Sequence, residues 1–209
     1  MKGLFVTMEG VEGSGKSTQI ALLRDYLQTE GRSVEVTREP GGTPIGEAIR
    51  ALLLDPANNA MDSMAELLLY EAARAQHVAQ RIRPALERGT FVICDRFCDS
   101  TTAYQGAGRR LSKEDMDRLH GLATRGLVPD LTILIDIPVA EGLARATRYR
   151  DSDRIELEPE EFHERVRQAF LDLAKVEPER IKIVDGLLPM DKVAEEIRSH
   201  AEAMLSHIV

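Results

Sequence analysis

The chain has few cysteines, and this absence narrows the classes of protein to which it can belong. Two cysteines, Cys94 and Cys98, occur in 209 residues, so a disulfide framework is excluded. No second pair of metal ligands accompanies them, which disfavours a zinc site. We expect Cys94 to be a small buried residue and Cys98 to lie in a loop.

Long apolar segments are missing as well. No run approaches the roughly 18 to 20 apolar residues of a membrane span, and the first residues lead directly into a motif rather than into a signal peptide. We therefore expect a soluble, cytoplasmic protein without a membrane partner.

An excess of basic residues is also lacking. The formal net charge is -8, whereas non-specific nucleic-acid binding needs a basic surface that displaces counterions. We expect no nucleic-acid partner. Small anions are not excluded, because a local cluster of arginines can outweigh the average charge. The composition, 43% hydrophobic and 30% charged, is that of a globular chain.

Short apolar runs alternate with longer segments of helical periodicity. The runs are rich in β-branched residues and predict buried parallel strands over 4–8, 34–37, 91–94, 131–135 and 181–184. Helices are predicted over 17–30, 45–54, 63–88, 113–125, 160–175 and 191–206. This alternation predicts an α/β fold with a five-stranded parallel sheet. Without a linker, repeat or low-complexity stretch, we expect one domain spanning residues 1–209.

The pattern G-x-x-x-x-G-K-[ST] is matched in full between the first strand and the first helix. It comprises Gly10, Val11, Glu12, Gly13, Ser14, Gly15, Lys16 and Ser17. Backbone N–H groups of such a loop and the helix N-terminus bind phosphates. We expect this P-loop and Thr18 to bind ATP, with Lys16 on the β- and γ-phosphates and Ser17 on Mg2+. A P-loop alone does not separate a kinase from a GTPase, an ATPase motor or a switch.

Four later segments follow the P-loop in a fixed order. They are Arg38-Glu39-Pro40-Gly41-Gly42-Thr43, Tyr70-Glu71-Ala72-Ala73-Arg74, the stretch 95–106 beginning Asp95-Arg96-Phe97, and Asp153-Arg154-Ile155-Glu156. Together with the P-loop, this set resembles the thymidylate kinase family of P-loop nucleoside-monophosphate kinases. The resemblance implies a three-layer α/β/α fold with a lid, ATP and dTMP as substrates, dTDP as product, Mg2+ as cofactor, and a homodimer.

The resemblance also places the base of dTMP. Tyr70 and Arg74 are four residues apart and share one helix face. In the family, the ring stacks on thymine and the arginine donates to O4, a position at which cytosine carries an amino group. The alternative interpretation is a surface Arg74–Glu71 pair with Tyr70 at the edge of the core. Thr101 and Gln105 are implied to lie near the base, and Tyr104 near the sugar.

Arg96 follows a predicted strand, at the sheet edge where ligands bind in open α/β folds. Its planar guanidinium suits a phosphate, and by resemblance Arg96 holds dTMP while Asp95 acts on Mg2+. The alternative is a structural Asp95–Arg96 pair. Arg50 is assigned to the acceptor phosphate, or else is a solvated helix arginine. The full expected acceptor set is Glu39, Pro40, Arg50, Tyr70, Arg74, Arg96, Ser100, Thr101, Tyr104 and Gln105.

Arginines gather in a polar stretch, about 145–155, that predicts a mobile lid: Arg145, Arg148, Arg150 and Arg154. The alternative is a solvated charge run. The variable P-loop positions carry no basic residue, which resembles the bacterial type of the family, in which the lid supplies the catalytic arginine. We expect Arg148 and Arg150 in that role, Arg145 on ATP, and Arg154 as a brace. Glu12 is placed near the acceptor sugar or Mg2+, or acts as a helix-dipole partner.

Two rival functions remain at this stage. One is another nucleoside or nucleotide kinase of the same fold; the other is a non-catalytic P-loop ATPase or switch. Arg96 argues against a nucleoside kinase, and the Tyr70–Arg74 pair with a lid argues against a switch. The attacking phosphate oxygen is already largely deprotonated at neutral pH, since its second pKa is about 6. Catalysis therefore needs no general base, and we assign it to Lys16, Arg96, Glu12, Arg148 and Arg150.

Overall fold

A computed structural model describes residues 3–147 and 152–206. In this part of the chain five parallel strands form one sheet, in the order β2-β3-β1-β4-β5. The strands are β1 Phe5–Glu9, β2 Val34–Arg38, β3 Phe91–Asp95, β4 Leu131–Asp136 and β5 Ile181–Asp185. Each predicted strand is present, which confirms the expected α/β class. Met8 of β1 is in register with Asp95 and Ile133, so the carboxyl ends of the strands meet at one edge.

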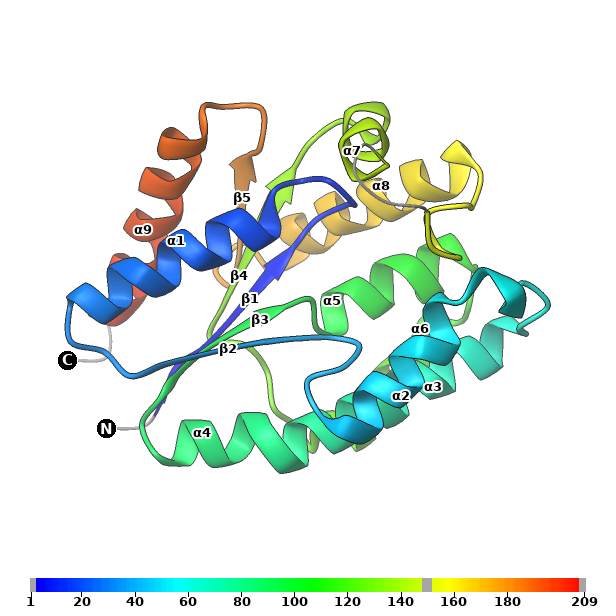
Figure 1. Ribbon diagram of the computed structural model, residues 1–209, viewed down its shortest axis with the longest axis horizontal. Helices are drawn as coiled ribbons and strands as arrows, with labels where there is room; N and C mark the ends of the chain where they lie inside the picture. The colour runs from blue at the N-terminus through cyan, green and yellow to red at the C-terminus, as the bar shows by residue number, and fades with distance from the viewer. Residues whose placement is uncertain (1–2, 148–151, 207–209) are drawn as a thin grey trace.

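Helices cover both faces of the sheet (Figure 1). α1 Lys16–Thr29 and α9 Met190–Ser206 pack over Val6, Met8 and Ile93 on one face. The opposite face carries α4 Arg83–Glu87 against Phe5 and Val92, and α8 Glu160–Val176 against Leu134. Successive strand residues point to opposite faces, so the uninterrupted apolar runs supply both layers. Further helices include α2 Pro44–Leu54, η1 Pro56–Asn58 and α6 Lys113–Thr124.

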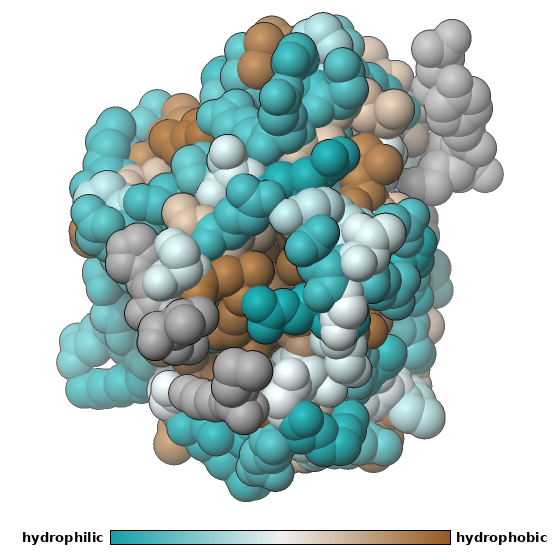
Figure 2. Space-filling model, turned by 90° about the vertical axis from the view of Figure 1, so that its left-hand side faces the viewer, coloured by the Kyte–Doolittle hydropathy of each residue, from teal (hydrophilic) through white to brown (hydrophobic). Residues whose placement is uncertain are grey.

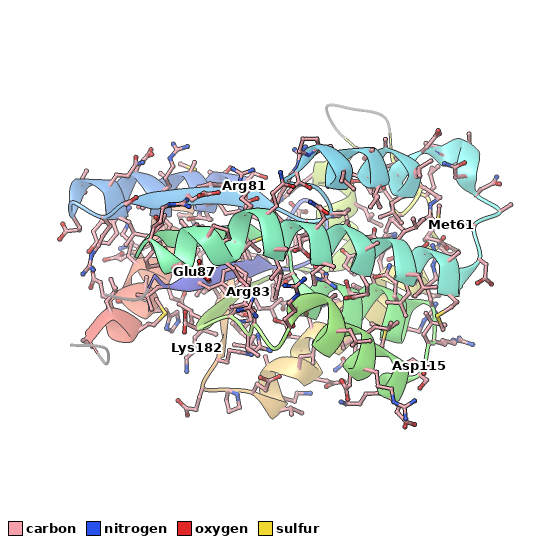
Figure 3. All side chains as sticks on the ribbon, turned by 90° about the horizontal axis from the view of Figure 1, so that it is seen from below. Met61, Arg81, Arg83, Glu87, Asp115 and Lys182 are labelled. Carbon is pink, nitrogen blue, oxygen red and sulfur yellow. The ribbon has the colours of Figure 1, made fainter. Side chains whose placement is uncertain are left out.

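The long helix predicted over 63–88 is interrupted by a π turn. It consists of α3 Ser63–His77, the π segment η2 Val78–Ile82, and α4. Pro84 lies directly after the turn and has no N–H to donate to the carbonyl four residues earlier, so the regular helix is locally broken. Figure 3 shows Arg81 and Arg83 on opposite sides of this helix. Arg81 reaches Glu35 at 2.6 Å, and Arg83 donates to the carbonyl of Arg125 at 2.7 Å.

The expectation that Cys98 lies in a loop is wrong, because Cys98 is the first residue of α5 Cys98–Thr101, which continues as the π-helix η3 Thr102–Gly108. Two glycines in η3 hide its helical pattern in the sequence. Cys94 is buried in β3 as expected. The short helix α7 Val139–Ala146 was also not predicted.

The opposite end of the molecule, where the strands begin, is seen in Figure 2. Apolar surface is visible in the middle of this face and is framed by hydrophilic residues. Among the described helices, none combines the length and the hydropathy that a membrane crossing requires. The candidate site lies away from this end, at the carboxyl edge of the sheet.

Candidate active site

A cavity of about 250 Å³ opens at the carboxyl edge of the sheet, beside the P-loop. Most of the expected site residues line it: Glu12, Gly13, Lys16, Ser17, Glu39, Pro40, Arg50, Tyr70, Arg74, Asp95, Arg96, Ser100, Thr101, Tyr104 and Gln105. Residues that the sequence did not single out for this site also line it: Arg38, Leu54, Phe97, Asp153, Ile155 and Glu156. The chain therefore brings both groups of expected residues, for donor and for acceptor, to one cavity.

The P-loop turns tightly into the first turn of α1. Gly15 caps α1 with a φ of 95°, a left-handed conformation that glycine adopts at no steric cost. The Nζ of Lys16 donates to the carbonyls of Gly10 at 3.0 Å and Val11 at 2.9 Å. Burial and the neighbouring Arg96 lower the pKa of Lys16 to about 8. Ser17 and Thr18 are exposed on the first turn of the helix.

Arg96 lines the cavity and contacts the P-loop. Its backbone has a φ of 70°, and its guanidinium donates to Glu12 Oε1 at 3.1 Å and to Ser100 Oγ at 3.0 Å. The expected alternative of an Asp95–Arg96 pair is not what forms, because Arg96 pairs with Glu12. The Tyr104 hydroxyl also donates to Glu12 Oε1, at 2.6 Å. Burial opposes ionisation of Glu12, but His163, Arg96, Lys16 and Tyr104 outweigh it and lower its pKa to about 2.

Glu9, which the sequence reasoning missed, supports the loop that carries Arg96. This wholly buried carboxylate accepts from the backbone N–H of Phe97 at 2.8 Å and from the Ser100 hydroxyl at 2.5 Å. Burial and the nearby Asp99 raise the pKa of Glu9 to about 8. The signal in the sequence was an acidic residue at the end of an otherwise apolar strand.

Arg74 also lines the cavity and is buried, with 1% of its side chain exposed. Its Nε donates to Glu39 at 2.8 Å, and its terminal nitrogens donate to Thr101 at 2.8 Å and to Glu71. The alternative of a surface Arg74–Glu71 pair is therefore wrong, because both side chains are buried. Tyr70 lines the cavity one turn earlier, and burial followed by the nearby Glu66 raises its pKa.

Gln105 lines the cavity, but its side-chain amide is hydrogen-bonded to α3. Its Nε2 donates to Glu66 Oε1 at 2.8 Å. Arg154 meets the same carboxylate at 2.6 Å and donates to the carbonyl of Leu53 at 2.8 Å. Arg154 is buried in these contacts, which connect the last part of the expected lid to Leu53 of α2 and Glu66 of α3.

Of the remaining expected residues, Arg50 lines the cavity and Arg145 is not among the lining residues. Arg50 is half-buried and donates to the carbonyl of Pro40 at 2.9 Å, so it is not a freely solvated arginine. Burial and the nearby Arg38 lower the pKa of Arg50. Arg145 is at the end of α7 and pairs with Glu141 at 2.8 Å. Arg148 and Arg150 lie outside the described residues.

Within residues 3–147 and 152–206, no three His, Cys, Asp or Glu side chains gather into a metal cage. Mg2+ in phosphoryl-transfer sites uses one or two carboxylates together with substrate phosphates and water. Asp95 fits that requirement, because its buried Oδ1 has no hydrogen-bond partner in the described structure.

Comparisons with known proteins agree on one family. The family model described as thymidylate kinase matches residues 8–197. The thymidylate kinase of Pelobacter propionicus is 51% identical over 201 residues, covering 93% of this chain and 92% of the relative. The thymidylate kinase of Deinococcus radiodurans is 50% identical, with 94% and 95% covered. The crystal structure of thymidylate kinase from Ehrlichia chaffeensis superposes with a TM-score of 0.79 at 35% identity, covering 97% of this chain and 99% of that one. The chain belongs to the thymidylate kinase family.

Proposed function

We propose that this protein transfers the γ-phosphoryl group of ATP to dTMP, giving ADP and dTDP for dTTP biosynthesis. The observation that carries the proposal is one cavity lined by Lys16 of the P-loop, by Arg96, by the buried Arg74 and by Tyr70. A site with phosphate-binding groups and a base-reading arginine suits a nucleotide acceptor. Membership of the family does not favour either rival function. These were a different nucleoside or nucleotide kinase and a non-catalytic P-loop ATPase or switch.

The acceptor is oriented by contacts at both of its ends. Arg96 donates to the dTMP phosphate with a guanidinium that Glu12 and Ser100 already hold in place. Arg74 donates to O4 of thymine, and the Tyr70 ring stacks on the base. The Tyr104 ring, under the Arg96 guanidinium at 4.9 Å, packs against the sugar and excludes a ribose hydroxyl.

Positioning and charge neutralisation carry the chemistry. Lys16 leaves the carbonyls of Gly10 and Val11 and donates to the β- and γ-phosphates of ATP. The exposed Ser17, through its hydroxyl, and Asp95, through its unpartnered Oδ1, would hold Mg2+. When bound, Mg2+ neutralises phosphate charge. The acceptor oxygen needs no base, so no histidine takes part in proton transfer.

The lid supplies the remaining positive charge. Arg148 and Arg150, from the arginine-rich stretch of about 145–155, approach the phosphates, while Arg145 contacts ATP beside Gly13. An arginine delivered in this way is worth about 10³ to 10⁵ in rate in other phosphoryl-transfer enzymes. We assign these roles within a single domain of residues 1–209.

The protein acts as a homodimer. Support comes from exposed apolar residues on α3 and on the two helices packed against it, namely Leu68 on α3, Ile45 and Leu52 on α2, and Leu122 on α6. Exposed apolar surface is a feature of protein–protein contacts. Sedimentation of the wild type and of Leu68→Asp tests the assignment, with Leu187→Asp, an exposed leucine elsewhere, as the control.

A coupled ADP-release assay across dTMP, dUMP, dCMP, UMP and thymidine tests the function. We expect dTMP to give the highest kcat/KM and thymidine to give none, since thymidine has no phosphate for Arg96. A higher value with another acceptor would contradict the substrate assignment. ADP release that is independent of any acceptor would support the ATPase or switch alternative.

A further inference from the structure

Two histidines without a part in the proposed chemistry flank Arg74. His77 on α3 places its Nδ1 2.9 Å from Glu39 Oε1. His120 on α6 places its Nδ1 3.0 Å from Glu71 Oε1. Glu39 and Glu71 are the two carboxylates that hold the Arg74 guanidinium. The base-reading arginine is therefore clamped between two carboxylates, and a histidine supports each of them.

The two histidines are connected in the same way. His77 Nε2 lies 2.6 Å from the Thr37 hydroxyl, and His120 Nε2 lies 3.0 Å from the Thr102 hydroxyl. A nitrogen that faces a carboxylate carries the proton, so each Nδ1–H donates to its glutamate, and each Nε2 accepts from its threonine. The result is a hydrogen-bonded chain of seven residues: Thr37, His77, Glu39, Arg74, Glu71, His120 and Thr102.

These seven hydrogen-bonded residues connect four elements and restrict the conformations that the Arg74 side chain can adopt. The hydrogen-bonded chain begins on β2, passes twice through α3, and ends on α6 and η3. His77 is fully buried, and a methyl group added at Gly42 would lie 2.5 Å from its Nε2. The guanidinium also lies over the Phe97 ring, 5.3 Å from its centroid. Direct contacts use three of the five N–H groups of Arg74, so two remain for the cavity.

The histidines help to hold the two carboxylates in place, because a carboxylate needs hydrogen-bond donors around it. Glu71 takes both of its donors, Arg74 and His120, on Oε1, and its buried Oε2 has no hydrogen-bond partner in the described structure. Without His120, Arg74 alone would hold this carboxylate, which could then rotate toward the base. A carboxylate oxygen in the base site would accept from the amino group of cytosine, whereas the Arg74 N–H groups match the O4 acceptor of thymine.

We propose that His77 and His120 are positioning residues for base selection. By keeping Glu39, which lines the cavity, and Glu71 paired with Arg74, they leave the remaining arginine donors rather than a free carboxylate oxygen to face the base. This inference rests on the proposed function, in which Arg74 donates to O4 of thymine. It assigns specificity to residues outside the cavity, since neither histidine lines it.

The test compares His120→Leu with His120→Asn, using kcat/KM for dTMP and for dCMP at saturating ATP. His120 is the better target because it is partly exposed at 15%. Loss of the donor in His120→Leu is expected to reduce the dTMP-to-dCMP preference at least tenfold, mainly through the KM for dTMP. The asparagine variant retains an N–H donor near the Nδ1 position and is expected to recover most of the preference. The KM for ATP should remain that of the wild type.

The control is His200→Leu, on α9 away from the cavity, which should preserve the preference. Equal losses with both acceptors in His120→Leu, or no recovery in His120→Asn, would overturn the inference. If His120→Leu does not fold, Thr102→Val is tested instead, because it removes only the hydroxyl that is hydrogen-bonded to His120 Nε2. A smaller loss of preference then supports the inference, and an unchanged preference refutes it. A wild-type enzyme without dTMP activity would instead refute the proposed function.

Discussion

The buried carboxylate of Glu9 accepts a hydrogen bond of 2.5 Å from the hydroxyl of Ser100. The same Ser100 oxygen accepts from Arg96, so a residue at the end of β1 is linked through one hydroxyl to the guanidinium expected to hold the acceptor phosphate. The second oxygen of Glu9 accepts from the backbone of Phe97. Arg96, directly before Phe97, has a left-handed backbone. Glu9 thus stabilises a turn that Arg96 would not adopt by its own preference.

Replacing Glu9 by Gln should change how stability depends on pH. Burial and Asp99 raise the pKa of folded Glu9 to about 8, from an ordinary value of 4.5. The folded state therefore binds this proton more tightly than the unfolded state. The stability from this group is complete below pH 4.5 and is lost as pH rises through about 8. One pKa unit corresponds to about 1.4 kcal/mol, so wild-type stability should fall by a few kcal/mol over this window.

Thermal unfolding of both proteins between about pH 5 and 8 measures the effect. The Tm of the wild type should decline by several degrees more than the Tm of Glu9→Gln, since glutamine has no proton to lose. A parallel decline in the two proteins would show that Glu9 is ionised throughout this range and would contradict the prediction.

Features encoded by local pattern could be predicted from the sequence. The five strands follow from apolar runs, and the P-loop follows from glycines at fixed spacing beside Lys16. Ser112, directly before the helix predicted over 113–125, caps α6 by accepting from the Asp115 backbone N–H. In these cases the residues that determine the structure are close together in the chain, so their spacing carries the information.

Contacts between distant segments could not be predicted in the same way. Glu9 and Ser100 are 91 residues apart, and Arg96 and Glu12 are 84 apart. The π-helix η3 has neither the period of an α-helix nor that of a strand, so its residues formed no recognisable pattern. The pairing of Arg74 with Glu71 was considered at the right spacing, but its burial involves Glu39 and Thr101, which come from distant parts of the chain.

Gly108 at the end of η3 should not tolerate a side chain. A Cβ there would lie 2.5 Å from the Phe162 ring, and this ring is buried edge-on against Tyr104, with the ring centroids 6.2 Å apart. Gly108→Ala should therefore displace Phe162, lower stability by about 1–3 kcal/mol, and raise the KM for dTMP through Tyr104. Gly106→Ala is the matched control in the same segment, because its nearest neighbour would be 3.9 Å away. Similar denaturant midpoints and KM values for the two variants would contradict the prediction.

Replacing Arg148 and Arg150 together by alanine should lower kcat more than it weakens ATP binding. The reason is that lid arginines neutralise charge that is concentrated between the two nucleotides during transfer. We expect a loss of at least about 10³ in kcat, measured in single turnover, beside a change of a few-fold in the dissociation constant for ATP. Arg24→Ala on α1, where Arg24 pairs with Asp25 in solvent, serves as the control for removal of an arginine. A change confined to ATP affinity would make the lid a binding clamp rather than a source of catalytic charge.

Gly142 should be required for the contact between α7, the helix before the expected lid, and the P-loop. A Cβ at Gly142 would lie 2.4 Å from the carbonyl oxygen of Glu12, and one at Gly13 would lie 2.1 Å from the carbonyl oxygen of Gly142. The two backbones are thus in direct contact. Alanine is favoured over glycine in a helix by about 1 kcal/mol, but a clash with backbone atoms cannot be relieved by rotation of a side chain. The clash should outweigh the gain in helix propensity, so Gly142→Ala must displace either α7 or the P-loop.

The expected result for Gly142→Ala is a fall in Tm together with a loss of about tenfold or more in kcat, because small displacements of groups that position a substrate are costly. Gly121→Ala on α6 is the matched control. A Cβ there meets nothing within 4 Å, so this variant should gain up to about 1 kcal/mol from helix propensity and keep full activity. Stability and kcat at or above the wild type in both variants would show that α7 can separate from the P-loop without consequence. A loss of stability and of kcat in Gly142→Ala alone would establish that direct packing of α7 against the P-loop is required for activity.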